Sequence, residues 1–543
     1  MAHMVLLGDE AVAVGAVHAG LTASYAYPGT PSTEITEYLL RYAAKHGAPK
    51  AAWCANEKTA YEEALGVSLV GRRALVSMKH VGLNVASDPF INSALVTIGG
   101  GLVAVVADDP GMHSSQNEQD SRYYADFARV ICLEPADQQE AYEMTREAFD
   151  LSERFHIPVL VRLVTRLAHS RAVVWVEGAR EENPLCKATD WTGWTLLPSN
   201  ARRQWHSLVE RQKDFQAFAE QSAHNTLTLT ARRDLGVITT GIARNYYVEN
   251  LEDVGNKAGK RPSHLHIGAY PIPAAKIREL VSHVEKVLVL EEGYPLVERF
   301  LRGLIPPGVA VAGKQSGEVP SDGELTPDIV RRALVLPVRK GVTLTDVTLP
   351  NRPPQLCNGC PHADTFKALR QALTSFAASL VTSDIGCYTL GALPPYSAVE
   401  SCVCMGASVG MAKGASDAGF RPSVGVIGDS TFLHSGITPL IDAVADNSDM
   451  TLVIVDNQAV AMTGGQPTIL PSSSLKPLVL GLGVNPQHCH VIRAHHTATK
   501  ANAEIMRSEL EYRGLSVIIA VRECIETARA GKKTATSAGE AAP

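Results

Sequence analysis

The feature that most constrains the fold is a pair of apolar, β-branched runs that flank a helical stretch, each closed by oxygen-bearing side chains. The first run ends in Gly428-Asp429-Ser430 and the second in Asp456-Asn457. This order predicts a strand, a helix and a second strand in one parallel sheet. Because the carboxyl ends of such strands lie side by side, where open α/β sheets bind ligands, the side chains at the two ends are expected to meet.

The spacing of these residues resembles the thiamine diphosphate motif, in which Gly-Asp-Gly or Gly-Asp-Ser precedes an Asn by the same interval. Here 26 residues separate Ser430 from Asn457. The resemblance implies that Asp429, Asn457 and the backbone carbonyl of Ala459 bind Mg²⁺, a hard cation that takes oxygen ligands. Gly428 and Ser430 would then contact the cofactor. An ordinary βαβ unit with a polar turn would give the same pattern, so both interpretations stay open on the motif alone.

Length and charge limit the class of protein. The 543 residues are enough for about three or four domains. A net charge of −6 without a basic block argues against a nucleic-acid partner. No apolar run reaches the ~18 residues of a membrane span, so we expect no membrane association. The opening residues MAHMVLLGDE lack the layout of a signal peptide, which predicts a cytoplasmic protein.

Two segments near the N-terminus carry candidate catalytic groups. The turn Tyr27-Pro28-Gly29-Thr30-Pro31 follows a predicted strand, and Ser32 or Thr33 is placed to cap the next helix. Glu57 begins an amphipathic helix, where the helix dipole favours an acid. Thiamine diphosphate needs a carboxylate on its aminopyrimidine ring before it loses its thiazolium proton, and Glu57 suits that role. A plain turn and a plain helix start remain the alternatives.

Half of the ten cysteines lie between residues 357 and 404, a clustering that calls for a reason. Four thiolates suit a [4Fe–4S] cluster or zinc. A Cys-x-x-Cys pair, such as the one in LCNGCPH, also occurs as a redox dithiol or by coincidence, so metal and no metal stay open. The row Gly406, Gly410 and Gly414 predicts a flat helix face. The ten cysteines are Cys54, Cys132, Cys186, Cys357, Cys360, Cys387, Cys402, Cys404, Cys489 and Cys524.

Together these segments resemble the α subunit family of indolepyruvate:ferredoxin oxidoreductase, in the 2-oxoacid:ferredoxin oxidoreductase superfamily. The resemblance covers nearly the whole chain, in the order YPGTPSTEI, NEK, MKHVGLNVASDP, DDPGMHSSQNEQDSR, LCNGCPH, SDIGCYTLG, CMGAS, GDSTFLHSGI and VDNQAVAMTGGQP. That family couples thiamine diphosphate to iron–sulfur electron transfer and makes an acyl-CoA from a 2-oxoacid and coenzyme A.

The resemblance implies an α/β fold of three doubly wound parallel-sheet domains of the thiamine diphosphate-enzyme type. Strand-like runs such as RALVSMKH, GLVAVVADD and IPVLVRLV alternate with helical stretches, as such a fold requires. The expected divisions are 1–178, a pyrimidine-binding-type domain; 179–228, a linker with a helix; 229–345, a transketolase C-terminal-like domain; 346–529, a diphosphate-binding domain with the iron–sulfur cysteines; and 530–543, a disordered tail.

The resemblance also assigns roles to single residues. It implies that one [4Fe–4S] cluster is held by Cys357, Cys360, Cys387 and Cys524. Cys402 and Cys404 would then be additional, and we expect them to be buried structural thiols.

Further roles follow from the same resemblance. Glu57 falls at the cofactor-activating glutamate and Thr30 at a substrate-contacting threonine. Gly406 lies in the CMGAS block and is a further cofactor-binding candidate. His80, His362 and His434 lie in family blocks and are candidates for moving protons near the thiazolium, although a hydrogen-bonded turn histidine is the plainer interpretation of each.

The expected activity is oxidative decarboxylation of an arylpyruvate such as indolepyruvate or phenylpyruvate to the acyl-CoA. The alternatives are a non-oxidative thiamine-dependent decarboxylase or carboligase and, with less support, a non-enzymatic electron-transfer subunit. The expected partners are a smaller γ-type subunit, a second copy of the large chain, coenzyme A and an electron acceptor. The family usually adds a ferredoxin-like domain with two Cys-x-x-Cys-x-x-Cys runs, and these 543 residues contain no such run. We therefore expect one cluster at most, with electrons leaving through a partner subunit or to an external acceptor, ferredoxin or another.

Overall fold

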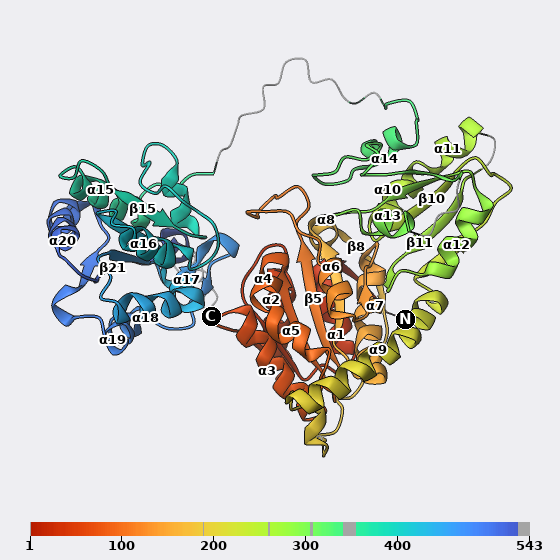
Figure 1. Cartoon of the computed structure of the whole chain (residues 1–543), viewed down its shortest axis with the longest axis horizontal. Coiled ribbons are helices and arrows are strands. Elements are labelled where there is room, and N and C mark those ends of the chain that lie inside the picture. The colour runs from red at the N-terminus through yellow and green to blue at the C-terminus, as the bar shows by residue number, and fades with distance from the viewer. Residues whose placement is uncertain are drawn as a thin grey trace, which may run out of the picture. The chain divides into compact units, whose positions relative to one another are not determined.

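The chain forms two compact units, Met1–Leu344 and Thr345–Pro543, drawn in Figure 1. The computed structural model describes residues 2–187, 189–258, 261–303, 308–339, 341 and 354–529. The tail expected at 530–543 lies outside the described residues.

The first unit is built around a seven-stranded sheet in which every strand pairs in parallel with its neighbour except at the β12–β6 edge, which is antiparallel. The strands in spatial order are β12 (Ala269–Tyr270), β6 (Cys132–Leu133), β7 (Val159–Val164), β5 (Leu102–Asp108), β4 (Ala74–Lys79), β2 (Ala23–Ala26) and β3 (Lys50–Trp53). The helices of this part are α1 (Gly8–His18), α2 (Thr33–His46), α3 (Glu57–Leu69), α4 (His80–Val85), α5 (Ser87–Ser93), α6 (Arg122–Ala128), α7 (Gln138–Phe155) and α8 (Thr165–His169).

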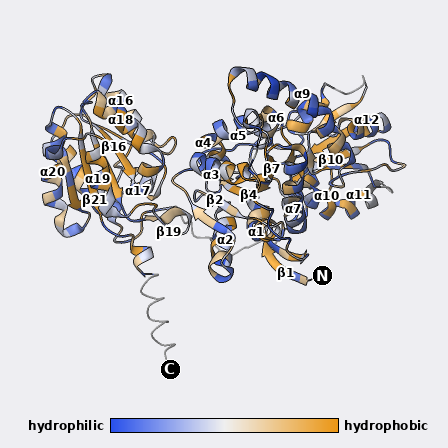
Figure 2. Cartoon of the chain, turned by 90° about the horizontal axis from the view of Figure 1, so that it is seen from below, coloured by the Kyte–Doolittle hydropathy of each residue, from blue (hydrophilic) through white to orange (hydrophobic). Residues whose placement is uncertain are grey.

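Hydrophobic burial explains why these runs form strands. Every residue of β5 and β7 is buried, as expected for a parallel sheet covered on both faces. Helix α7 packs on both strands and against α1. The strands of all the larger sheets are largely hydrophobic in Figure 2. The strands predicted from RALVSMKH, GLVAVVADD and IPVLVRLV are confirmed.

A second sheet in the same unit has a parallel core with β9 as an antiparallel edge. Its order is β14 (Ala310–Ala312), β13 (Lys286–Leu290), β10 (Gly236–Thr240), β11 (Ser263–Ile267) and β9 (Asn225–Thr228). Its helices are α10 (Ala243–Glu249), α11 (Leu251–Ala258), α12 (Ala274–His283), α13 (Leu296–Leu301) and α14 (Pro327–Ala333).

Three further elements complete the first unit. The helix predicted in the linker is present as α9 (Pro198–Gln221). Strands β1 (Ala2–Leu7) and β8 (Arg171–Val176) form a separate antiparallel ribbon. Strand β12 pairs with the seven-stranded sheet although its residues fall in the expected 229–345 division. The internal division of this unit therefore stays a prediction.

The second unit holds a five-stranded, all-parallel sheet. Its order is β15 (Leu380–Ser383), β16 (Ser423–Gly428), β17 (Thr451–Asp456), β21 (Ser516–Val521) and β20 (Cys489–Arg493). Its longer helices are α15 (Pro361–Leu373), α16 (Ala407–Asp417), α18 (Ile437–Ala445), α19 (Ser472–Gly481) and α20 (Thr499–Glu511). A short ribbon, β18 (Ala459–Val460) and β19 (Gln466–Pro467), follows β17. The α/β fold with parallel sheets is confirmed.

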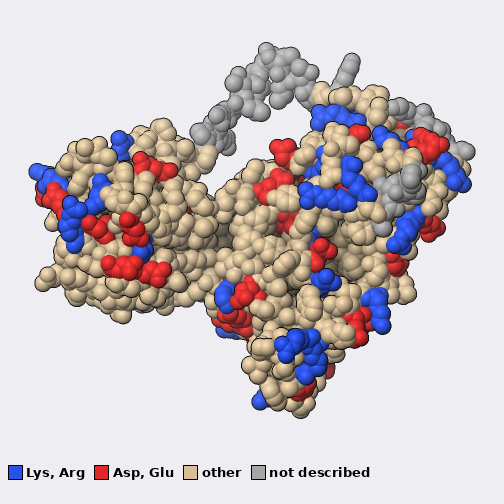
Figure 3. Space-filling model, in the orientation of Figure 1, with Lys and Arg blue, Asp and Glu red and all other residues tan. Residues whose placement is uncertain are grey.

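Two surface properties bear on partners. Acidic and basic side chains are interspersed over the face that Figure 3 shows. Among the described residues, none of the helices combines the length and the apolar character that crossing a membrane requires.

Candidate active site

The predicted strand–helix–strand unit is present, and its polar ends meet. Strands β16 and β17 are fully buried and pair in parallel, with Gly428 opposite Val455. The carboxylate of Asp429 accepts hydrogen bonds from the amides of Ser430 at 2.9 Å and Gln458 at 2.7 Å. The same Gln458 amide lies 3.2 Å from Asp456, so it joins the two strand ends. The parallel register thus brings two carboxylates together at the carboxyl edge of the sheet.

Asp429 and Asp456 form a pair of neighbouring carboxylates, whose like charges a bound cation would neutralise. Burial, and then the charge of Asp456, raise the pKa of Asp429 to about 8. Within the described residues, neither acid pairs with a lysine or an arginine. The side-chain oxygen of Asn457 accepts from the amide of Ala459 at 3.3 Å, beside the same edge. A divalent cation among these oxygens would offset the repulsion, so the donor set fits Mg²⁺.

Two glycines shape this edge. A Cβ on Gly428 would stand 2.6 Å from Cε1 of the Tyr388 ring. Gly406 caps α16 with φ +86°, and a Cβ there would stand 2.6 Å from Cβ of Ser435. The close approach at Gly428 and the left-handed backbone at Gly406 both require glycine. The start of α16 is held by Asp384, whose carboxylate accepts from the Ser408 hydroxyl at 2.6 Å.

The predicted histidines of the second unit are buried. His362 Nε2 lies 3.4 Å from Nδ2 of Asn457, and burial lowers the His362 pKa to about 4, which keeps the ring neutral. His434 lies in the π-helical turn Phe432–Gly436, with Nδ1 2.5 Å from the Ser435 hydroxyl. His362 therefore lies beside the predicted Mg²⁺ ligands, while the protein hydrogen bond of His434 fits a turn histidine.

The four cysteines expected to hold a cluster converge. The pKa of Cys387 is raised to about 12. Burial is the largest cause, and the charges of Cys360, Cys524 and Cys357 raise it further, in that order. The pKa of Cys360 is also raised, first by burial and less strongly by Cys357 and Cys524. Arg522, two residues before Cys524, reaches the Cys-x-x-Cys loop through the carbonyl of Gly359. Loops at the start of α15, after β15 and after β21 thus bring four thiols within electrostatic reach.

The expectation for the other two cysteines is wrong. Cys402 and Cys404 are exposed in this chain, not buried. They lie in the segment 400–406, which connects to α16 and contains no strand or helix of its own. The charges that act on Cys402 come from Asp384 and Cys404, and the four converging thiols are not among them.

In the first unit, Glu57 lies where the helix start was predicted. The Asn56 side chain caps α3 by accepting from the Thr59 amide at 2.8 Å. Glu57 is the first residue of the helix and is only 5% exposed. Its carboxylate lies against Gly82 of α4, because a Cβ on Gly82 would stand 2.6 Å from Oε1 of Glu57. A buried acid in this position fits a carboxylate that meets a ligand rather than solvent.

The Thr30 turn is held by its own side chains. The Ser32 hydroxyl donates to the Gly29 carbonyl at 2.8 Å, and Thr33 Oγ1 accepts from the Gly29 amide at 3.0 Å. Neither hydroxyl caps the helix as predicted, because both turn back to the loop that precedes α2. The Thr30 hydroxyl makes no hydrogen bond with the described residues, while its carbonyl lies 3.4 Å from the Ser114 hydroxyl.

Strand β4 ends beside this turn. His80 is 1% exposed, and its Nε2 lies 3.1 Å from the carbonyl of Asn117. Burial lowers the pKa of His80 below its usual value, which favours the neutral ring. Lys79 donates to the carbonyl of Ser114 at 2.9 Å, and burial lowers its pKa to about 8, opposed by the charges of Asp109 and Glu57. Glu57, Lys79 and the Thr30 turn therefore share one corner of the first unit.

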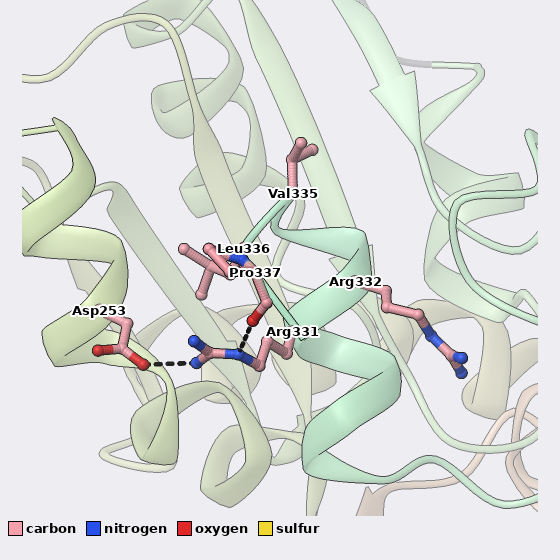
Figure 4. Close-up of a pocket in the computed structure, with 6 residues that line it drawn as sticks. All are labelled: Asp253, Arg331, Arg332, Val335, Leu336 and Pro337. Carbon is pink, nitrogen blue, oxygen red and sulfur yellow. Dashed lines mark hydrogen bonds and ion pairs between the residues drawn. The ribbon is translucent and has the colours of Figure 1, made fainter. Parts of the chain in front are cut away.

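One surface pocket of about 630 Å³ lies apart from these residues, between helices α11 and α14 of the first unit (Figure 4). The charge of Arg331 is already compensated, since Asp253 pairs with it and the carbonyl of Pro337 accepts from it. Arg332 points away from that pair in Figure 4. The pocket contains none of the residues predicted from the sequence.

Comparisons with known proteins agree with this geometry. Residues 14–195 match the family described as "Pyruvate flavodoxin/ferredoxin oxidoreductase, thiamine diP-bdg". Residues 384–519 match "Thiamine pyrophosphate enzyme, C-terminal TPP binding domain". The two matches contain Glu57 and Asp429, respectively.

Full-length relatives decide the family. The chain is 37% identical to the indolepyruvate oxidoreductase subunit IorA of Archaeoglobus fulgidus, over 96% of this chain and 86% of that protein. It is 38% identical to IorA of Methanothermobacter thermautotrophicus over the same shares. The chain belongs to the IorA family. As a member of that family, it belongs to the thiamine diphosphate-dependent oxidoreductases.

A solved structure supports the fold of this IorA-family chain. The 2-oxoglutarate:ferredoxin oxidoreductase of Magnetococcus marinus superposes with a TM-score of 0.51, over 61% of this chain and 65% of that one. Its sequence identity is 17%, so this likeness concerns the fold alone.

The sequence analysis gave no role to two polar groups that the structure places beside the predicted site residues of this IorA-family chain. The sequence marks Asp456 only as the neighbour of Asn457, yet its carboxylate faces Asp429 across the Gln458 amide. Lys79 was not singled out, although it ends a buried strand just before His80. In both positions the signal was a charged residue at the carboxyl end of an apolar strand, which is where open α/β sheets bind ligands.

Proposed function

We propose that this chain is the large subunit of an enzyme that oxidatively decarboxylates an arylpyruvate-type 2-oxoacid, indolepyruvate or phenylpyruvate, to the acyl-CoA. Electrons would leave through one [4Fe–4S] cluster held by Cys357, Cys360, Cys387 and Cys524. The names of the IorA relatives support the substrate class. The smaller γ-type subunit, the pairing of two large chains, coenzyme A and the acceptor, ferredoxin or another, belong to the same proposal.

A single observation carries the oxidative part of the proposal. The amide of Cys524 donates to the carbonyl of Asn457 at 2.9 Å. A backbone hydrogen bond therefore links the residue of one proposed cluster ligand to the residue of one proposed Mg²⁺ ligand. A cluster at this position would lie at the same sheet edge as the diphosphate of the cofactor, which favours electron transfer over the non-oxidative alternative.

The polar residues of the two units would divide the work. Asp429, Asn457 and the carbonyl of Ala459 would hold Mg²⁺, and Asp456 would add negative charge beside it. Glu57 would hold a proton on its carboxylate at the aminopyrimidine ring. Bound thiamine diphosphate supplies the carbon nucleophile and the electron sink of the decarboxylation. The burial of Glu57 keeps water from its carboxylate.

The remaining predicted groups keep their roles as proposals. Gly428, Ser430 and Gly406 would line the diphosphate. Thr30 would contact the substrate. The neutral ring of His80 suits a proton relay better than a charged one would, and His434 has the weaker case, because its Nδ1 already contacts Ser435.

Anaerobic purification with the smaller subunit tests the proposal. We expect about four irons and one thiamine diphosphate per large chain. We also expect dye reduction that needs both an arylpyruvate and coenzyme A. A protein that releases CO₂ and an aldehyde without reducing the dye would instead be the non-oxidative enzyme. Aliphatic 2-oxoacids with small side chains are the specificity control.

A further inference from the structure

Lys79 has hydrogen-bonding capacity that the described residues do not use. Its ammonium donates to the carbonyl of Ser114 at 2.9 Å, and no carboxylate of the described residues forms an ion pair with it. An ammonium carries three N–H donors. Two donors of a half-buried cation are therefore available to a ligand.

Burial lowers the pKa of Lys79 only to about 8, so the ammonium still carries its charge at neutral pH. The charges of Asp109 and Glu57 favour the protonated form and oppose the effect of burial. Asp109 cannot turn to neutralise Lys79, because its carboxylate already accepts from the Ser114 amide at 2.8 Å, the Ser115 hydroxyl at 2.6 Å and the Thr165 hydroxyl at 2.7 Å. The adjacent His80 is kept neutral by burial, so Lys79 supplies the positive charge at this end of β4.

Ser114 joins Lys79 to the Thr30 turn. Its carbonyl accepts from Lys79, while its hydroxyl lies 3.4 Å from the Thr30 carbonyl. The aliphatic stem of Lys79 also passes the turn, because a Cβ on Gly29 would lie 3.5 Å from Cδ of Lys79. Ser114 therefore contacts both the Thr30 backbone and the Lys79 ammonium, which places the two residues on either side of it.

We propose that Lys79 and Thr30 form a subsite for the 1-carboxylate of the 2-oxoacid. The ammonium would bind one carboxylate oxygen and the Thr30 hydroxyl the other. This inference rests on the proposed function, because it takes a 2-oxoacid as the substrate. A partly desolvated cation binds an anion more strongly than an exposed lysine does, since less water competes for it. The subsite would select 2-oxoacids over the corresponding aldehydes and amides.

Inhibition by a matched pair of ligands tests the subsite in the complex of the large chain with its smaller subunit. The pair is 3-phenylpropanoate, which carries the carboxylate, and 3-phenylpropanamide, which is neutral. In Lys79→Met we expect the inhibition constant of the carboxylate and the KM for phenylpyruvate to rise by about 10- to 100-fold, the loss of a charged hydrogen bond. The inhibition constant of the amide and the thiamine diphosphate content should not change.

Three further variants control the experiment. Lys79→Arg should lose less affinity for the carboxylate, because it keeps the charge but not the geometry. Thr30→Val should weaken the binding of the carboxylate inhibitor by about tenfold or less, as expected for the loss of a neutral hydrogen bond. Lys58→Met removes an exposed lysine of α3 that pairs with Glu62, and it should behave as wild type.

The outcomes separate the two proposals. Unchanged constants for both ligands, or an equal rise for both, in an active Lys79→Met complex would overturn the subsite and leave the proposed function intact. A wild-type complex that oxidises no 2-oxoacid would overturn the proposed function and the subsite with it. If Lys79→Met does not fold, the same comparison is made with Lys79→Arg and Thr30→Val, where a wild-type ratio of the two inhibition constants contradicts the subsite.

Discussion

The carboxylate of Glu57 occupies the space that the missing side chain of Gly82 leaves. A Cβ on Gly82 would stand 2.6 Å from Oε1, 2.8 Å from Cγ and 2.9 Å from Cδ of Glu57. Helices α3 and α4, which carry these two residues, pack together at the carboxyl edge of the first sheet. The position of the proposed activating acid therefore depends on a glycine 25 residues further along the chain.

Gly82→Ala should displace the Glu57 carboxylate and reduce turnover by at least about tenfold, since small misplacements of a catalytic group are costly. Thiamine diphosphate should still bind. The measurement is steady-state turnover together with cofactor content. Gly66→Ala is the matched control on α3, because open space surrounds a Cβ there, and alanine favours a helix. Equal activity of the Gly82 and Gly66 variants would contradict the proposed contact.

Glu57→Gln should leave cofactor binding nearly intact and lower turnover by about 10²- to 10⁴-fold, the usual contribution of a proton-transferring group. The amide keeps a hydrogen bond but cannot share the proton. Glu62→Gln, on the same helix and exposed, is the control. A Glu57→Gln enzyme with near-wild-type turnover would assign the activating role to another acid.

Asp429→Ala should abolish Mg²⁺-dependent binding of thiamine diphosphate, because the diphosphate would lose its main charge neutralisation. Calorimetric titration with and without Mg²⁺ measures the loss. Asp442→Asn changes an exposed acid of α18 and should bind the cofactor like wild type. Unaltered cofactor affinity in the Asp429 variant would exclude the proposed metal site.

Serine at Cys357, Cys360, Cys387 or Cys524 should each reduce the iron content well below the roughly four irons expected per chain, because thiolate ligation is the rule for these clusters. Serine at the exposed Cys402 or Cys404 should cost far less iron. Iron analysis and the dithionite-sensitive visible absorbance provide the readouts. Loss of the cluster from Cys402→Ser and its survival in Cys524→Ser would show that the fourth ligand is wrongly assigned.

Glu292→Gln tests a buried acid in the first unit. Burial raises the pKa of Glu292 to about 7, although its Oε1 accepts from the Leu325 amide at 2.9 Å. A folded-state pKa above the unfolded value means that the native state binds the extra proton. The stability from this group is therefore present below about pH 4.5 and lost as pH rises through about 7.

The Gln variant should thus gain stability over wild type as pH rises from 5 to 8, by about 2 kcal/mol. Urea unfolding at both pH values measures the difference. Glu279→Gln, at an exposed position of α12, should show no such trend. A constant difference between pH 5 and pH 8 in the Glu292 variant would contradict the raised pKa.

The sequence by itself determined the elements and the strand ends at which we propose that ligands bind. Apolar runs with period two or without polar interruption predict buried parallel strands, and β2, β4, β5, β7, β16 and β17 follow them. The meeting of Asp429 with the end of β17 was also predictable, because parallel register alone places consecutive strand ends side by side. The expectation that four cysteines converge came from the family resemblance, because their spacing alone did not decide whether they bind a metal.

Only the tertiary structure decided which side chains support those ends. Ser114 contacts Lys79 and Thr30 across 35 and 84 residues of sequence, respectively. The contact between Gly82 and Glu57, the pairing of β12 with the first sheet and the exposure of Cys402 are likewise results of packing. Periodicity and propensity are local properties of a chain. Contacts between distant segments depend on how the finished layers fit together, and no local pattern encodes that fit.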